Sequence, residues 1–222
     1  MVAAGRLLAL LFCLLTAGTA MAGSADVALL RAAALGDKTA AVAALNAGAA
    51  IDARDAHLQT PLLIAIQSDN RDVAAHLIAR GADINAVAAN EDTPWLLAGA
   101  LGRASLLAAM LETGKVDYTK RNRYGGNALI PACERGHVET VRLLLDRSEI
   151  DVNHINNLGW TALLEAVILS DGGPSHIEIV RLLLAAGAAP NIADRDAVTP
   201  LAHAHDRRYD AIAGMIAEAG GK

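Results

Sequence analysis

A short pattern similar to Thr-Pro-Leu recurs along the chain at an almost constant spacing, and it limits the possible folds more than any other feature. Copies begin at positions 60, 93, 127, 161 and 199, so that successive copies are 33, 34, 34 and 38 residues apart. These tetrads are Thr60–Leu63, Thr93–Leu96, Asn127–Ile130, Thr161–Leu164 and Thr199–Ala202. A fixed period of this length is typical of stacked units that bury their apolar faces against one another. We therefore expect a repeat solenoid.

A second marker shares the register of the tetrads. The residue eight positions before each tetrad is Asp52, Asn85, Thr119, Asn153 or Asn191. Because this offset is constant, the extra residues of the longest repeat fall elsewhere, within Ser170–Ser175, where they are predicted to lengthen a turn between two helices. A further unit fits upstream from near Val27, which makes six units.

Local signals predict two helices in each unit. Thr60 can cap a helix that has Pro61 in its first turn, where the missing N–H costs nothing. Gly48, Gly81, Gly114 and Gly187 follow apolar runs and can end the second helix in the left-handed conformation, and Ser148 takes this place in one unit. An apolar content of 54% with only 3% aromatic residues suits helices packed through small side chains.

These segments resemble the ankyrin repeat family over nearly all of the chain after residue 26. The tetrads are similar to its Thr-Pro-Leu-His opening, Gly136–Leu145 to its Gly-His start of the second helix, and Ala186–Asn191 to its Ala-Gly-Ala-Asp-Val-Asn exit. The resemblance implies an all-α solenoid of about six helix-turn-helix units joined by extended finger loops. Such units bind proteins through the finger tips and first helices, while the second helices form the back.

Two departures from the family pattern carry predictions. Apolar residues replace the tetrad histidine, so we expect apolar packing there; they are Leu63, Leu96, Ile130, Leu164 and Ala202. The glycine two residues before the tetrad is kept as Gly125 and Gly159 but replaced by Leu58, Glu91 and Ala197. At these three finger turns the family pattern predicts the fold least well.

The first 22 residues have a different character from the repeats. Arg6 precedes the largely apolar stretch Leu7–Ala17, and Ala20–Ala22 supplies a small-residue cleavage pattern. This is typical of a secretory signal peptide, whereas a membrane anchor needs about 20 apolar residues. We expect a signal peptide over 1–22, a repeat domain over 23–222 and no stable membrane anchor after cleavage. An alanine-rich chain with such a leader indicates the bacterial periplasm.

Catalytic and metal-binding patterns are weak. Cys133 and His137 are four residues apart, which on one continuous helix would place them on one face. Gly136 lies between them where the helices turn, so packing is the expected role of Cys133. A spacing of two puts His203 and His205 on different faces of a helix. We predict no enzyme activity, cofactor or metal; an enzyme using Cys133 and His137 is the alternative.

A protein partner is the function that the sequence favours. The formal net charge of −5 argues against general nucleic-acid binding. Arginine, tyrosine and tryptophan often anchor interfaces, and they meet in two neighbouring units. The predicted contact residues are Arg121, Arg123, Tyr124, Glu134, Arg135, Leu158 and Trp160. Alternatively, Trp160 packs on a neighbouring finger and the arginines are only solvated, and residues 170–175 are either a second contact or a tolerated loop.

These observations predict a monomeric, non-catalytic interaction scaffold in the bacterial periplasm. The alternative within binding is an inhibitor or immunity protein that blocks a periplasmic enzyme or toxin.

Overall fold

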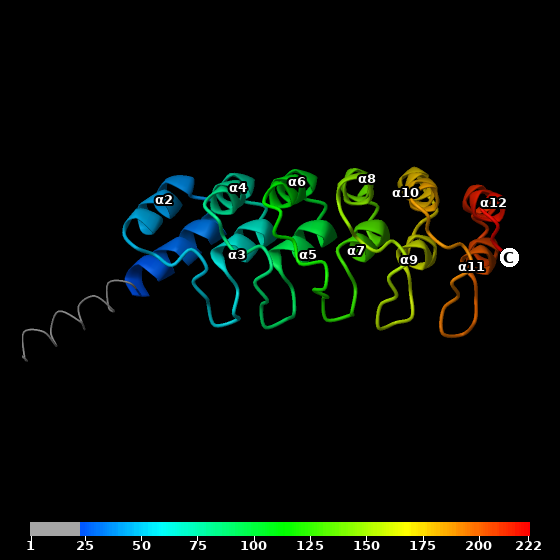
Figure 1. Cartoon of the computed structure of the whole chain (residues 1–222), viewed down its shortest axis with the longest axis horizontal. Coiled ribbons are helices and arrows are strands. Elements are labelled where there is room, and N and C mark those ends of the chain that lie inside the picture. The colour runs from blue at the N-terminus through cyan, green and yellow to red at the C-terminus, as the bar shows by residue number, and fades with distance from the viewer. Residues whose placement is uncertain (1–22) are drawn as a thin grey trace, which may run out of the picture. The chain divides into compact units, whose positions relative to one another are not determined.

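The computed structural model describes residues 23–222, which form pairs of helices joined by loops and contain no strand in this range (Figure 1). They fall into two compact units, one ending at Asp83 and the other spanning Ile84–Lys222. The predicted signal peptide lies outside the described residues.

The first unit holds two helix pairs. Residues 23–35 are helical and pair with α2 (Lys38–Asn46), and α3 (Pro61–Gln67) pairs with α4 (Arg71–Ala79). The second helices α2 and α4 also pack on each other. The helical pattern near Val27 therefore begins a repeat, as the register predicted.

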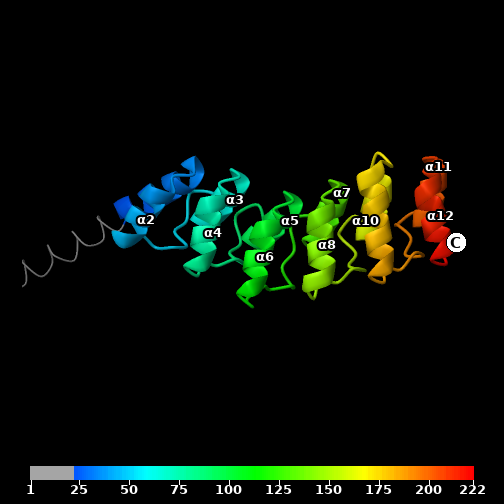
Figure 2. The ribbon, with the colours of Figure 1, turned by 90° about the horizontal axis from the view of Figure 1, so that it is seen from above.

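The second unit holds four further pairs in two layers. The first helices are α5 (Pro94–Ala100), α7 (Leu129–Glu134), α9 (Ala162–Ile168) and α11 (Pro200–Asp206). The second helices are α6 (Ala104–Glu112), α8 (Val138–Arg147), α10 (Pro174–Ala185) and α12 (Asp210–Glu218). Within each layer, successive helices pack on one another, and each first helix packs on its own second helix. The fingers project on the first-helix side (Figure 1), and the second helices run side by side in Figure 2.

The tetrads start the first helices as predicted. Each threonine side chain accepts a hydrogen bond from the backbone N–H three residues later, at 3.2 Å for Thr60, Thr93 and Thr161 and 3.3 Å for Thr199. Asn127 replaces threonine in the third tetrad, where its Oδ1 accepts from Leu129 and Ile130. These bonds satisfy N–H groups that would otherwise be buried without a partner.

The residues that replace the tetrad histidine are packed in the core in four of the five tetrads. Leu63, Leu96, Ile130 and Leu164 are buried, and Ala202, in the last repeat, is half-buried. Apolar packing therefore takes the place of polar bonding in these four repeats.

The three finger turns without glycine adopt the same backbone conformation as the two that have it. Leu58, Glu91 and Ala197 have φ values of 57°, 66° and 60°, in the same left-handed region as the glycines. The backbone explains this: in the last finger the Asp194 N–H donates to the Val198 carbonyl, and the Ala197 N–H donates to Asp194. The Oδ1 of Asp194 also accepts from two backbone N–H groups. The closed turn imposes the conformation on whichever residue occupies it.

Replacing Ala197 with glycine is expected to stabilise the protein by about 1 kcal/mol, because an L-residue pays about 1–2 kcal/mol in this conformation. Gly214 is the matched control. It lies inside α12 with no atom within 4 Å of an added Cβ, so Gly214→Ala should also stabilise, by roughly 1 kcal/mol. Urea unfolding measures both changes, and a destabilised Ala197→Gly protein would contradict the strain argument.

Side chains at the start of the second helices join neighbouring repeats through backbone carbonyls. The Nδ2 of Asn70 donates to Ala33 at 2.8 Å, and the hydroxyl of Tyr209 donates to Ser170 at 2.8 Å. His137 is hydrogen-bonded to the carbonyl of Ala100, and the Nε2 of His176 lies 3.1 Å from the carbonyl of Glu134. We call these side chains the carbonyl tethers.

The insertion predicted to lengthen a turn also lengthens a helix, which corrects the prediction. Pro174 and Ser175 belong to α10, which has 12 residues where α4 and α6 have nine. Proline is favourable in a first helical turn. The added helical turn keeps His176 at the tether position, and its Nδ1 lies 3.0 Å from Asp171 Oδ1.

Candidate functional site

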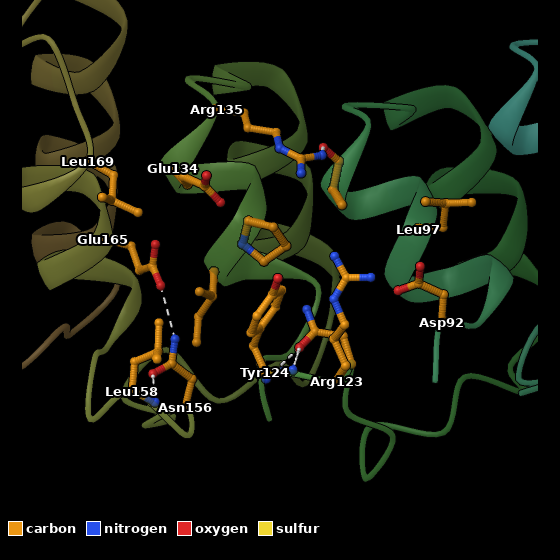
Figure 3. Close-up of a pocket in the computed structure, with 15 residues that line it drawn as sticks. Asp92, Leu97, Arg123, Tyr124, Glu134, Arg135, Asn156, Leu158, Glu165 and Leu169 are labelled. Carbon is orange, nitrogen blue, oxygen red and sulfur yellow. Dashed lines mark hydrogen bonds between the residues drawn. The ribbon is translucent and has the colours of Figure 1, made fainter. Parts of the chain in front are cut away.

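A pocket of about 430 Å³ opens in the second unit between three fingers and three first helices (Figure 3). Helices α5, α7 and α9 supply one side of it, and the fingers before α7 and α9 supply the other, together with Asp92 at the end of the finger before α5. The volume lies within the range of small ligand sites. The fold thus forms a built concavity on the side where the fingers project.

Five of the seven predicted contact residues line this pocket. They are Arg123, Tyr124, Glu134, Arg135 and Leu158. Arg121 instead bonds to its own finger, where its Nη1 donates to the carbonyls of Tyr118 and Lys120 at 2.6 and 2.8 Å. Trp160 is half-buried outside the lining. The role of all seven residues in partner contact stays a prediction.

One end of the pocket contains both arginines and a carboxylate. The Arg123 guanidinium carbon lies 4.8 Å from the centroid of the Tyr124 ring, and Arg135 Nη1 donates to the Ala100 carbonyl at 2.7 Å. Burial raises the pKa of Asp92, while its hydrogen bond from Asn90 and the two guanidinium charges act in the opposite direction. The exposed Tyr124 ring and Arg123 form a stacked pair at the pocket mouth.

The other end contains a buried carboxylate that sequence reasoning missed. Glu165 is 4% exposed, and its Oε1 accepts from Asn156 Nδ2 at 2.9 Å. Its pKa is raised to about 7, mainly by burial and also by the charge of Glu134, and the hydrogen bond from Asn156 partly offsets these two effects. The available signal was a carboxylate inside the otherwise apolar run Ala162–Ile168, where the repeats before it have Ile64, Leu97 and Pro131.

Cys133 lies in the core below the pocket, with its side chain fully buried. Burial raises the pKa of the thiol well above its usual value, and the charge of Glu165 raises it further. This environment opposes the thiolate that a nucleophile requires. His137 lies in the turn before α8 and is engaged as a carbonyl tether. The geometry fits the packing role expected from the sequence.

Cys133 in the folded protein is therefore expected to react with a thiol reagent at least about 100-fold more slowly than in denaturant, because reaction requires exposed thiolate. Colorimetric titration with an aromatic disulfide measures both rates. Fast labelling of the native protein would show that α7 opens readily or that the thiol is accessible.

His203 and His205, the pair considered for metal binding, do not form a cluster. His203 Nε2 lies 2.7 Å from Asp194 Oδ2, whereas His205 is exposed. Within residues 23–222, no group of three or more His, Cys, Asp and Glu side chains could hold a metal ion. No helix in the same part of the chain is long and apolar enough to cross a membrane.

Comparison with known proteins agrees with this architecture. A model of three ankyrin repeats matches residues 95–194, and a single-repeat model matches residues 57–89. YahD of Escherichia coli (strain K12) is 38% identical over 191 residues, which cover 86% of this chain and 94% of YahD. The chain belongs to the ankyrin repeat family.

Solved structures show the same fold. An ankyrin repeat domain from Acinetobacter baumannii AYE is 48% identical with a TM-score of 0.83, covering 87% of this chain and 98% of that domain. The ankyrin repeat protein EF0377 is 41% identical with a TM-score of 0.84 and covers the same shares. The predicted solenoid of helix-turn-helix repeats is therefore confirmed. This fold generally mediates protein–protein interaction and is typically non-catalytic.

Proposed function

We propose that the chain is a protein-binding scaffold of the bacterial periplasm and that it holds its partner at the pocket between α5, α7 and α9. The observation that carries the proposal is the stacked Arg123–Tyr124 pair at the mouth of a formed pocket. Tyrosine and arginine are enriched among the residues that dominate binding energy. The pair stands exposed at the pocket mouth, where a partner can contact both side chains.

Affinity capture from a bacterial envelope extract tests this surface. The chain without residues 1–22 should retain a protein that the variant Arg123→Ala/Tyr124→Ala loses by at least about tenfold. Arg147→Ala is the control, because Arg147 pairs with Glu112 in the second-helix layer and such exposed ion pairs contribute little. Equal capture by the double variant would place the contact elsewhere, and no retained protein would contradict the scaffold role.

The periplasmic location rests on the leader pattern of Arg6, Leu7–Ala17 and Ala20–Ala22. Expression with a C-terminal tag, followed by osmotic-shock fractionation and N-terminal sequencing, tests it. The periplasmic fraction should hold a chain that begins at Gly23. A tagged chain that keeps Met1 and stays in the cytoplasmic fraction would contradict the proposal.

A further inference from the structure

The pocket has an acidic end without a cation. Among residues 23–222, the only hydrogen-bond donor to the Glu165 carboxylate is the neutral amide of Asn156. Glu134 lines the same end and takes part in no ion pair within that range. Its charge makes ionisation of Glu165 less favourable and raises the Glu165 pKa. Keeping both groups ionised is costly, and the cost is relieved either by a proton on Glu165 or by a positive charge that joins the two carboxylates.

The arginines that line the pocket do not supply this charge. Arg135 donates to the Ala100 carbonyl, and Arg123 lies over Tyr124. Their charges lower the pKa of Asp92, whereas neither contributes to the shift at Glu165. Figure 3 shows the same division, with Arg123 toward Asp92 and Glu165 on the side of Leu158 and Leu169. The positive charge that would balance Glu134 and Glu165 must therefore come from a bound molecule.

The walls next to the acidic end suit a hydrocarbon stem. Ile130, Pro131, Leu158 and Leu169 line the pocket, and the two leucines are 46% and 48% exposed. Long cationic side chains lay their methylene groups along apolar surface and place the charge at the tip. Apolar walls that lead to two carboxylates are complementary to such a side chain.

We propose that the Glu134–Glu165 end of the pocket binds the side chain of a lysine or arginine from the partner protein. This inference rests on the proposed scaffold function and specifies the chemistry of its partner. The two carboxylates receive the cationic tip, and Leu158 and Leu169 contact the methylene stem. Asn156 holds the Glu165 carboxylate in position through its amide bond.

Binding of small capped peptides tests the inference without knowledge of the partner. Acetyl-Gly-Arg-Gly-amide and acetyl-Gly-Lys-Gly-amide are titrated at millimolar concentration into the isotope-labelled chain, and amide chemical shifts are followed. At least one of the two should shift the amides around Asn156 and Glu165. The peptide with norleucine in the central position keeps the stem without the charge and should bind about tenfold more weakly or not at all.

Variants locate the site. Glu165→Gln keeps the Asn156 hydrogen bond and the side-chain shape, and Glu134→Gln changes a half-buried residue. Each should weaken binding of the cationic peptide by about tenfold. Glu139→Gln is the matched control, because exposed Glu139 lies on α8 in the second-helix layer and should leave binding unchanged. Equal binding of the norleucine and cationic peptides, or full binding by both pocket variants, overturns the inference.

The two proposals fail in distinguishable ways. If the envelope partner depends on Arg123 and Tyr124 but neither cationic peptide shifts the pocket amides, the scaffold function stands and the inference is wrong. If the peptides bind through Glu165 while the intact chain retains no protein, the pocket chemistry stands and the scaffold role is wrong.

Discussion

Trp95→Ala is expected to destabilise the second unit by about 3–5 kcal/mol. Trp95 occupies the third position of its tetrad, is 2% exposed and is among the largest fully packed side chains of the described residues. Its ring meets the Tyr118 ring edge to face, with centroids 6.0 Å apart and an interplanar angle of 88°. Truncation removes this contact and leaves a cavity that the short helix α5 cannot close. Chemical unfolding followed by circular dichroism measures the loss.

Trp95→Leu is the matched control for this prediction. Leucine stands at the equivalent position of other tetrads, as Leu62, Leu129 and Leu163. It should cost less than alanine because it fills part of the space and keeps the repeat pattern. Equal losses in the two variants would mean that the aromatic contact with Tyr118, rather than the volume, carries the stability.

Glu165→Gln is expected to stabilise the fold by about 2 kcal/mol above pH 7 and to leave it nearly unchanged near pH 4.5. Burial raises the pKa of Glu165 to about 7 from an ordinary 4.5. The folded state therefore holds this proton more tightly than the unfolded state. The stabilisation is present below the unfolded pKa and is lost as pH rises through 7, where the buried group must ionise. Glutamine removes this loss because it carries no charge.

Urea unfolding of both proteins between pH 4.5 and 8 measures the difference. Carboxylates whose pKa values are lowered act in the opposite direction but at lower pH; Glu178, at about 2, is the most shifted. They are unchanged in the variant and cancel from the difference. Glu139→Gln should show the pH profile of the unsubstituted chain. A constant difference between the Glu165→Gln and unsubstituted proteins across this range would contradict the raised pKa.

The helix starts could be predicted from the sequence because their cause is local. A threonine followed by proline specifies a cap within four residues, and Thr60, Thr93 and Thr199 form the bonds that this chemistry requires. The backbone conformation of the finger turns could not be predicted in the same way. Leu58 and Ala197 disfavour positive φ by themselves, but hydrogen bonds closing the turn around them decide the outcome.

The candidate site could be predicted only in part, because the sequence shows residue types but neither side-chain direction nor burial. Residue types typical of interfaces pointed to Arg123, Tyr124 and Arg135, which line the pocket. The direction of a side chain on a finger depends on which carbonyls lie near it, so Arg121 could not be distinguished from them by composition. Glu165 was missed because its cost becomes visible only when its burial is known.

The carbonyl tethers have a consequence for how repeats of this kind can vary in length. His176 reaches the Glu134 carbonyl although five extra residues precede it, and Asp171 within this insertion bonds to the other ring nitrogen of His176. A repeat can therefore gain residues between its two helices without losing its contact with the preceding repeat.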